Sequence, residues 1–171
     1  MNHTNATPNL DEHDLDIIRE LERNDDKNLE EFADELDLSK SAIHYRLNKL
    51  KESGVITDIS ADIDPHALGM SMVVITEVYV SHESGYADEI GDELVDVTGV
   101  QQVYYTMGDV DFMAVSRVQN HEQMNELIDG IVAIKGVNET SSRFVMRELK
   151  KGNRLLESMS AEMIDRVLET E

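Results

Sequence analysis

The chain has 171 residues, of which 36 are Asp or Glu and 15 are Lys or Arg, so its formal net charge is -21. It contains no cysteine, which excludes disulfides and cysteine-ligated metals. The longest strongly apolar run, residues 70–75, is far shorter than the roughly 20 residues that span a bilayer, and the polar first residues lack a signal-peptide core. We therefore expect one or two small globular domains in a soluble, cytoplasmic protein that does not bind membranes.

The acidic residues are spread through every segment and do not form an acidic tail. Together with the low lysine content, this composition is typical of a surface that stays hydrated and soluble in concentrated salt through self-repulsion. We interpret it as a halophilic surface, and an acidic protein of a mesophile is the alternative. Overall acidity also argues against a nucleic-acid partner, because duplex DNA repels an anionic body.

The first part of the chain predicts a disordered start and two short helices. Residues 1–9 are small and polar, and Asp11 then caps a first helix that runs to about Asn24. Asn28, followed three residues later by Glu31 as in a capping box, opens a second helix. The apolar residues at helical spacing are Leu15, Ile17, Ile18 and Leu21 in the first helix and Leu29, Phe32, Ala33 and Leu36 in the second.

The next stretch, residues 39–50, reverses the charge of the chain, because it and the residue after it hold four bases and no acid. Ser39 is a good N-cap, and Leu38 and Ile43 occupy the two places of a hydrophobic staple. A helix over this stretch has a core face and an opposite polar face. Ile43, Leu47 and Leu50 lie on the first face, and Ser41, Tyr45 and Asn48 lie on the second.

Three short helices with a tight turn before the basic one describe a helix-turn-helix whose last helix enters a DNA major groove. Hydroxyl and amide groups on its outer face suit base edges, imidazole and phenol groups suit bases or phosphates, and lysines suit phosphates. Arg46 lies near the buried stripe, so helix geometry leaves its role ambiguous. The predicted DNA-binding residues are Ser39, Lys40, Ser41, His44, Tyr45, Arg46, Asn48, Lys49 and Lys51. An ordinary three-helix bundle with a solvated basic face is the alternative.

Gly54 is expected to end the third helix. Residues 55–63 alternate apolar with polar side chains, which predicts a strand that forms half of a wing. The proline and glycine of DPHALG, residues 64–69, indicate a hinge between domains. The predicted division is a disordered start over 1–9, a helix-turn-helix domain over 10–63, the hinge, a second domain over 70–152 and an amphipathic helix over 153–171.

The second domain predicts the order strand, helix, strand, strand, helix, strand, which is the ferredoxin-like arrangement. The expected ranges are 70–80, 85–97, 100–106, 110–118, 121–134 and 136–149. Met107, Gly108 and Asp109 connect the two middle strands in a hairpin turn. Two helices cover one face of such a sheet, so the open face needs a partner such as a second sheet. We expect the C-terminal helix to pack on its own sheet or on that of a partner.

In combination, these features resemble the Lrp/AsnC (leucine-responsive regulatory protein) family of transcription factors over nearly all of residues 10–150. The similar stretches are LEEFADELDLSKSAIHYRLNKLKESGVI, the hinge DPHALG, the glycine-aspartate motif GDVDF and the final strand GVNETSSRFVM. The resemblance implies an α+β protein with a winged helix-turn-helix domain and a ferredoxin-like effector domain, here of a halophilic archaeal type. It further implies a homodimer or higher even oligomer that binds palindromic double-stranded DNA and, in many members, an amino acid near the glycine-aspartate turn.

The turn itself offers what an amino-acid zwitterion requires. The backbone amide region at Gly108 can hold a carboxylate, and the carboxylate of Asp109 or Asp111 can hold an ammonium. Hydroxyl groups on the last strand can add hydrogen bonds. The predicted effector-binding residues are Met107, Gly108, Asp109, Asp111, Thr140 and Ser142. A plain hairpin with exposed aspartates is the alternative.

The remaining patterns in the chain are a second cluster of bases and six histidines. The bases Arg143, Arg147, Lys150, Lys151 and Arg154 enclose a single acid, Glu148. This group either pairs with acidic neighbours or extends the DNA footprint. The six histidines lack metal-ligand spacing and no catalytic constellation is apparent, so we expect no metal, no cofactor and no enzyme activity. A sirohaem-decarboxylase-like enzyme, which resembles this family in both domains, and a stand-alone metabolite sensor are the alternatives.

Overall fold

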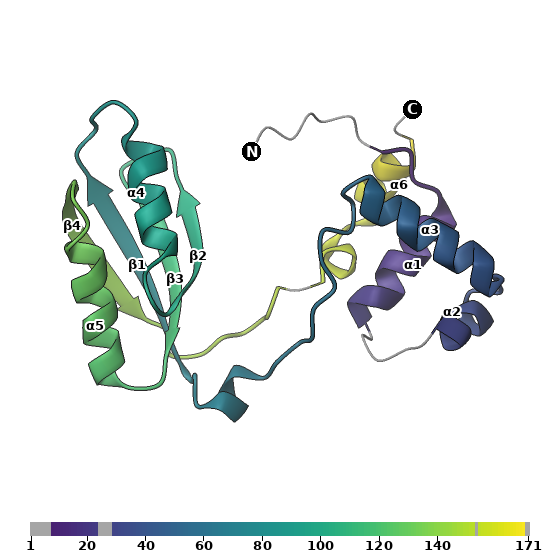
Figure 1. Ribbon diagram of the computed structural model, residues 1–171, viewed down its shortest axis with the longest axis horizontal. Coiled ribbons are helices and arrows are strands. Elements are labelled where there is room, and N and C mark those ends of the chain that lie inside the picture. Colours follow the sequence, from purple (N-terminus) through teal and green to yellow (C-terminus); the bar gives the residue numbers. More distant parts are fainter. Residues whose placement is uncertain (1–7, 24–28, 153, 170–171) are drawn as a thin grey trace. The chain divides into compact units, whose positions relative to one another are not determined.

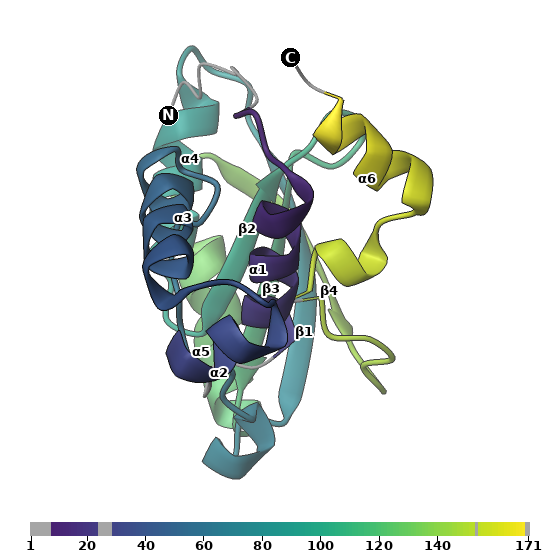
Figure 2. The same ribbon diagram turned by 90° about the vertical axis from the view of Figure 1, so that its right-hand side faces the viewer.

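The computed structural model describes residues 8–23, 29–152 and 154–169 and divides the chain into two compact units (Figures 1 and 2). One unit comprises the residues up to Asp62 together with the residues from Lys150 onward, and the other is Ile63–Leu149. The predicted disorder of residues 1–9 lies outside the described residues except at Pro8 and Asn9. No helix within the described ranges is both long and apolar enough to cross a membrane.

The first unit contains the three predicted helices, α1 (Glu12–Arg23), α2 (Leu29–Glu35) and α3 (Lys40–Glu52). The side chain of Asp11 accepts a hydrogen bond of 2.9 Å from the backbone N–H of Asp14, so the predicted cap of the first helix is confirmed. The expected cap at Asn28 and the expected helix end at Asn24 lie outside the described residues. The buried core of the helices consists of Leu10, Leu15, Ile17, Phe32, Ala33, Ile43 and Leu50.

The segment after α3 differs from its prediction. Gly54 follows the helix with a left-handed backbone at φ 74°, as expected for a terminating glycine. Residues 55–63 form no strand, so the predicted strand at this position is wrong for a single chain. Alternation alone does not make a strand, because the backbone donors and acceptors need a neighbouring strand, and the described part of this unit contains none. Val55 and Ile56 instead pack against the helical core.

The C-terminal segment also differs from its prediction. It forms a short 3-10 turn, η2 (Leu156–Ser158), and a helix, α6 (Ala161–Leu168), and it packs on the helix-turn-helix rather than on a sheet (Figures 1 and 2). Leu156 is 8% exposed and belongs to the same core as α1 and α3. The expected contact with the chain's own sheet is therefore wrong. The amphipathic pattern of α6 specifies one apolar face, but it does not specify which apolar surface that face meets.

The second unit begins with a capped 3-10 turn, η1 (Pro65–Leu68), and continues as the predicted ferredoxin-like order. Its elements are β1 (Met72–Val80), α4 (Tyr86–Val95), β2 (Val100–Tyr105), β3 (Phe112–Val118), α5 (His121–Val132) and β4 (Val137–Phe144). The sheet is antiparallel throughout and has the strand order β2-β3-β1-β4. Helices α4 and α5 lie on one face of it (Figure 1).

The strands show the two-residue alternation of a sheet with one covered face. Val74, Thr76 and Val78 of β1 are buried, while the residues between them are only half-buried. The covered face forms a core with Ile90 and Leu94 of α4 and with the buried residues of α5. On the opposite face lie half-buried apolar residues of the two central strands, namely Val73, Ile75, Met113 and Val115.

The last strand is shorter than predicted, because β4 ends at Phe144 and residues 145–149 are not paired as a strand. The register explains the difference, since Phe144 already lies opposite Val74, near the beginning of β1. Beyond this point an ion pair holds the chain to the sheet. Arg117 of β3 is 7% exposed, and its Nη2 lies 2.6 Å from Oε2 of Glu148.

Neighbouring leucines allow a test of the C-terminal docking. Leu156→Ala should lower the free energy of unfolding of the helix-turn-helix unit by about 2 to 4 kcal/mol, because it removes a buried side chain from the core. Leu155→Ala is the matched control, since Leu155 is 69% exposed and its loss should cost less than about 0.5 kcal/mol. Urea denaturation followed by far-UV circular dichroism measures both. Equal effects of the two substitutions would contradict the docking.

Candidate DNA-binding and effector sites

Local sequence and core packing together fix the position of α3. The hydroxyl of Ser39 accepts a hydrogen bond of 3.2 Å from the N–H of Ala42, which is the predicted N-cap. Ile43 and Leu50 are fully buried in the core, and Leu38 packs beside them. The helix is thus held along one face and at its start, which leaves the opposite face open.

The open face carries the residues predicted to read bases. Ser41, His44, Tyr45 and Asn48 are all exposed, and Tyr45 is 71% exposed. Asn48 and His44, one helical turn apart, form a side-chain hydrogen bond of 3.2 Å, and the hydroxyls of Ser41 and Ser39 lie 3.1 Å apart. The face therefore presents amide, imidazole, phenol and hydroxyl groups together, a mixture of donors and acceptors that suits base edges.

The three lysines of α3 differ in their surroundings. Lys40 forms an ion pair with Glu30 of α2. Lys49 lies 3.7 Å from Oδ2 of Asp14 and 3.4 Å from the backbone carbonyl of Asn9. Lys51 is exposed and has no ion pair with any residue that the structure describes. The pair of Lys40 with Glu30 is exposed and can be exchanged for a phosphate contact at little cost, whereas the partner of Lys49 is a buried carboxylate.

Arg46 has a different environment, because its guanidinium points back to the start of α1. Its Nη1 donates to Oδ2 of Asp11 and to Oδ1 of Asp14, each at 2.7 Å. Asp14 is completely buried, whereas the Arg46 side chain is 22% exposed. The hydrogen bonds to Asp11 and then Asp14 raise the pKa of Arg46. The guanidinium of Arg46 is thus used in a contact within its own domain, and this contact competes with base reading.

The two aspartates form an anionic socket for this arginine. Burial by itself raises the pKa of Asp11, but the hydrogen bond from Arg46 and that from the N–H of Asp14 outweigh it, and the net pKa lies below its ordinary value. The carboxylate of Asp14 in turn accepts a hydrogen bond of 3.3 Å from the backbone N–H of Asp11. A role for Asp14 was not predicted from its position, because an acidic residue in the first turn of a helix is common for capping alone.

In the second unit, the predicted effector turn joins β2 and β3. Met107 is 99% exposed, and Gly108 has a φ of 145°, a conformation that favours glycine. The hydroxyl of Thr106 donates to the carbonyl of Val110, and the N–H of Thr106 donates to the carbonyl of Asp111 at 2.9 Å. These bonds close the hairpin and leave its tip in solvent.

The two aspartates of the turn have separate environments. Asp111 is bound within the fold, accepting from the N–H of Val80 at 2.9 Å and contacting Nε2 of His82 at 2.6 Å. Burial raises the pKa of Asp111, but these two bonds outweigh it and the net pKa lies below its ordinary value. Asp109 is exposed and has no ion pair or side-chain hydrogen bond with a described residue. Of the two predicted carboxylates, only Asp109 is therefore open to a ligand in this chain.

The two predicted hydroxyls of β4 do not reach the turn within one chain. Thr140 lies opposite Val78, and Ser142 lies opposite Thr76, to which it is hydrogen-bonded at 3.0 Å. Since β1 separates β4 from β3, these residues are two strands, or roughly 10 Å, from the strand that follows the turn. The structure therefore does not bring Thr140 and Ser142 together with Gly108.

An aromatic cluster beside the turn was not predicted from the sequence. His82 stacks on Tyr86 with ring centroids 4.8 Å apart, and the hydroxyls of Tyr86 and Tyr105 are 2.7 Å apart. This hydrogen bond raises the pKa of Tyr86 to about 12. Tyr105 in turn contacts the buried Phe112. The four residues come from the loop after β1 and from α4, β2 and β3. Tyr86 and Tyr105 are 19 residues apart, so no local spacing could indicate their contact.

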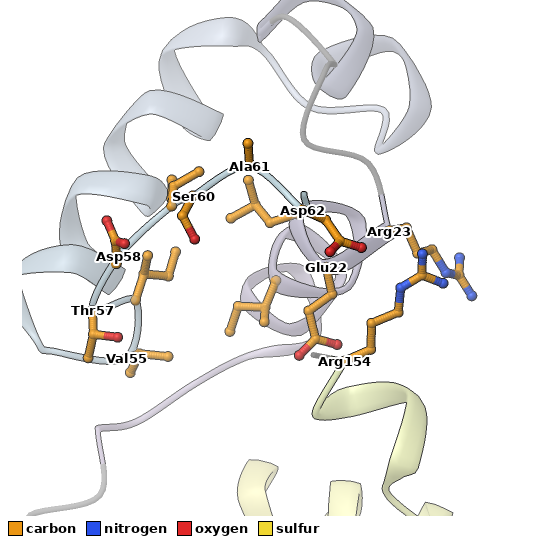
Figure 3. A pocket seen from close by; sticks show the side chains of 13 residues that line it. Glu22, Arg23, Val55, Thr57, Asp58, Ser60, Ala61, Asp62 and Arg154 are labelled. Carbon is orange, nitrogen blue, oxygen red and sulfur yellow. The ribbon is translucent and has the colours of Figure 1, made fainter. Parts of the chain in front are cut away.

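A groove of about 650 Å³ opens on the helix-turn-helix unit (Figure 3). It is lined by Ile18, Leu21, Glu22 and Arg23 of α1, by residues 55–62 and by Arg154. The carboxylate of Glu22 accepts hydrogen bonds from the backbone N–H groups of Leu155 and Leu156, the shorter at 2.6 Å. The groove thus follows the seam where the C-terminal segment rejoins this unit.

Two family models match the chain. The one described as "Winged helix-turn-helix DNA-binding" matches residues 10–57, and the one described as "Lrp/AsnC ligand binding domain" matches residues 73–155. The chain belongs to the Lrp/AsnC family. The HTH-type transcriptional regulator FL11 of Pyrococcus horikoshii is 36% identical over 146 residues, 85% of this chain and 95% of the relative. The regulator LysM of Sulfurisphaera tokodaii is 32% identical over 139 residues, 81% of this chain and 96% of the relative.

Solved structures agree with this assignment. A transcriptional regulator of Neisseria meningitidis in complex with L-methionine has a TM-score of 0.80 at 20% identity, over 85% of this chain and 96% of that chain. The feast or famine regulatory protein of M. tuberculosis, complexed with L-methionine, has a TM-score of 0.76 at 25% identity, over 84% and 96%. The predicted fold class is confirmed, and this Lrp/AsnC protein is a DNA-binding transcription regulator. Residues 156–171, which include α6, lie beyond both family models.

The socket for Arg46 can be tested by stability. Arg46→Met leaves the buried Asp14 without its main cation, so it should destabilise the helix-turn-helix unit by about 3 kcal/mol. This value is near the lower limit for breaking a buried ion pair, because Lys49 still lies near Asp14 in the variant. Arg19→Met is the control, since its bridge to Asp16 joins two half-exposed side chains of one helix and contributes less than about 1 kcal/mol. Urea unfolding compares the two variants. Similar costs would show that the socket does not hold α3.

Proposed function

We propose that this regulator reads its operator with the open face of α3, using Ser41, His44, Tyr45 and Asn48 for bases. Their exposure and their distance from the buried stripe support this assignment. The amide of Asn48 can donate and accept at once, as a base edge requires, while the hydroxyl of Ser41 can do either. Ser39 acts as the cap that positions the start of the helix.

Phosphate binding falls to the lysines, Lys40, Lys49 and Lys51. Each can neutralise a phosphate from the margin of α3, and Lys51 does so without giving up a partner among the described residues. Arg46 is assigned a bracing role, because leaving Asp11 and Asp14 to contact DNA would strand a buried carboxylate. One of the four positive charges of α3, that of Arg46, thus holds the helix against α1.

A homodimer through the ferredoxin-like units completes the proposal. The half-buried apolar residues on the open sheet face, including Ile75 and Val115, give a second sheet a surface to cover. A two-fold dimer presents two copies of α3 to half-sites about 34 Å apart, which predicts a palindromic operator. Regulation of transcription in the cytoplasm accounts for the whole chain, so we assign it no enzymatic reaction.

Binding to the upstream region of its own gene tests the reading helix. Asn48→Ala should lower the preference for that duplex over a scrambled one by about 1 to 3 kcal/mol, or roughly 5- to 150-fold, in fluorescence anisotropy. Lys51→Gln should weaken both duplexes equally and reduce the salt slope by about 0.9. Lys135→Gln, another exposed lysine without an ion pair among the described residues, is its control and should leave the slope unchanged. An unchanged preference in Asn48→Ala would refute the assignment.

An amino-acid effector is the second part of the proposal. Two relatives of the same fold are complexed with L-methionine, and the hairpin here offers the free carboxylate of Asp109 beside Gly108. An ammonium would pair with Asp109, and a carboxylate would accept from the backbone of the turn. Since the tip of the hairpin is exposed, a second copy must cover it before the ligand is enclosed, which couples effector binding to assembly.

Titration calorimetry with L-methionine tests this site. Asp109→Asn should weaken binding at least tenfold, because it removes the charge that pairs with the ammonium. Asp111→Asn should instead destabilise the second unit by about 1.5 to 3 kcal/mol, because its bonds to Val80 and His82 are structural. Asp129→Asn, on the exposed side of α5, is the charge-matched control. Binding by Asp109→Asn equal to that of the wild type would exclude the proposed pairing.

A further inference from the structure

A second group of bases follows the last strand. Residues 143–154 carry five bases and one acid in a chain whose net charge is -21. Two of these bases have partners in the structure, since Arg143 lies 2.5 Å from Glu77 and Arg154 lies 3.5 Å from Glu157. The other three are Arg147, Lys150 and Lys151, which we call the basic segment. All three side chains are exposed, and none has an ion pair or side-chain hydrogen bond with a described residue.

The basic segment contains three of the five lysines and arginines that have no ion pair among the described residues. Among the described residues, every other lysine or arginine except Lys51 and Lys135 forms an ion pair. Acids outnumber bases by more than two to one in the whole chain, so a shortage of acids does not explain the missing partners. Three cations within five residues that pair with none of the described acids are better satisfied by an external polyanion.

The basic segment is also tied to the DNA-binding unit. Four residues after Lys151, the backbone N–H groups of Leu155 and Leu156 are bound by the carboxylate of Glu22 on α1. The side chain of Leu156 is buried in the helix-turn-helix core. A fully extended chain covers at most about 14 Å over four residues, so Lys151 must lie within that distance of the anchor. Lys150 and Lys151 thus belong to the unit that carries α3.

We propose that Arg147, Lys150 and Lys151 are a second DNA-contacting segment, which binds the phosphate backbone of duplex DNA outside the half-site read by α3. This inference rests on DNA binding through α3, as proposed above. The contacts are purely electrostatic, so they add affinity and salt dependence without adding sequence preference. The anchoring by Glu22 and Leu156 gives the C-terminal extension a function, because it holds Lys150 and Lys151 on the DNA-binding unit. Arg147 precedes Lys150 by three residues along the chain.

A second copy of this acidic chain is the competing occupant. The side chains of Met146, just before the basic segment, and Leu149, within it, are 92% and 80% exposed and would suit a protein contact. The phosphate backbone is favoured because Lys150 and Lys151 belong to the unit that carries α3, and because neutralising phosphates is the usual role of exposed cations on a DNA-binding unit. The two occupants give different results when oligomeric state and salt dependence are measured together.

The test uses the full-length triple variant Arg147→Gln, Lys150→Gln and Lys151→Gln. Its affinity for the operator is measured by anisotropy at several salt concentrations. Loss of three phosphate contacts should reduce the magnitude of the log–log salt slope by about 2.7, while the preference for operator over scrambled duplex is retained. The charge-matched control changes Arg19, Lys135 and Arg166 to Gln on other surfaces and should keep the wild-type slope.

Two outcomes would overturn the inference. One is a slope equal to that of the control variant. The other is a shift to a smaller oligomer in sedimentation velocity, with a wild-type slope for the oligomer that remains, which would assign the segment to a second copy. Asn48→Ala in the same assay separates this inference from the proposed function. If Asn48→Ala loses sequence preference while the triple variant behaves as the wild type, only the inference fails.

Discussion

The DNA-binding unit depends on a buried carboxylate. Asp14 has no exposed surface, and Arg46 supplies the main positive charge that makes its burial tolerable. Because Asp14 belongs to α1 and Arg46 belongs to α3, the requirement to neutralise one buried charge fixes the crossing of these two helices. Apolar packing alone allows small shifts of one helix over another, whereas two hydrogen bonds of 2.7 Å do not. This constraint therefore fixes the orientation of the open face of α3 within the unit.

The same unit recruits residues from the far end of the chain. Leu156 completes the core of helices that begin at Glu12, and Glu22 binds the backbone that leads to it. The helix-turn-helix is thus built from two separate stretches, and the second unit is inserted between them. Two covalent connections therefore join the units.

In the effector unit, two neighbouring aspartates are used differently. Asp111 joins the hairpin to the end of β1 through Val80 and His82, and this bonding holds the turn in one shape. Asp109 is left in solvent at the tip. Rigid support beneath an exposed polar group is what a binding site requires, because the ligand then need not order the loop itself. The aromatic stack of His82 and Tyr86 extends the same support.

The sequence by itself determined the order of the elements, the faces of the helices and the start of α3. These features follow from periodicity and capping, which act over three or four residues, and the N-cap at Ser39 lies where the pattern predicts. It also located the glycine-aspartate turn. Tertiary structure alone decided which partners the charged and apolar groups meet. The pairing of Arg46 with Asp14, the bonding of Asp111, the docking of Leu156 and the missing strand at residues 55–63 each depend on segments distant in the sequence. The position of a residue in the sequence pattern specifies the face of its helix or strand on which the side chain lies. The partner of that side chain is specified only by the tertiary fold.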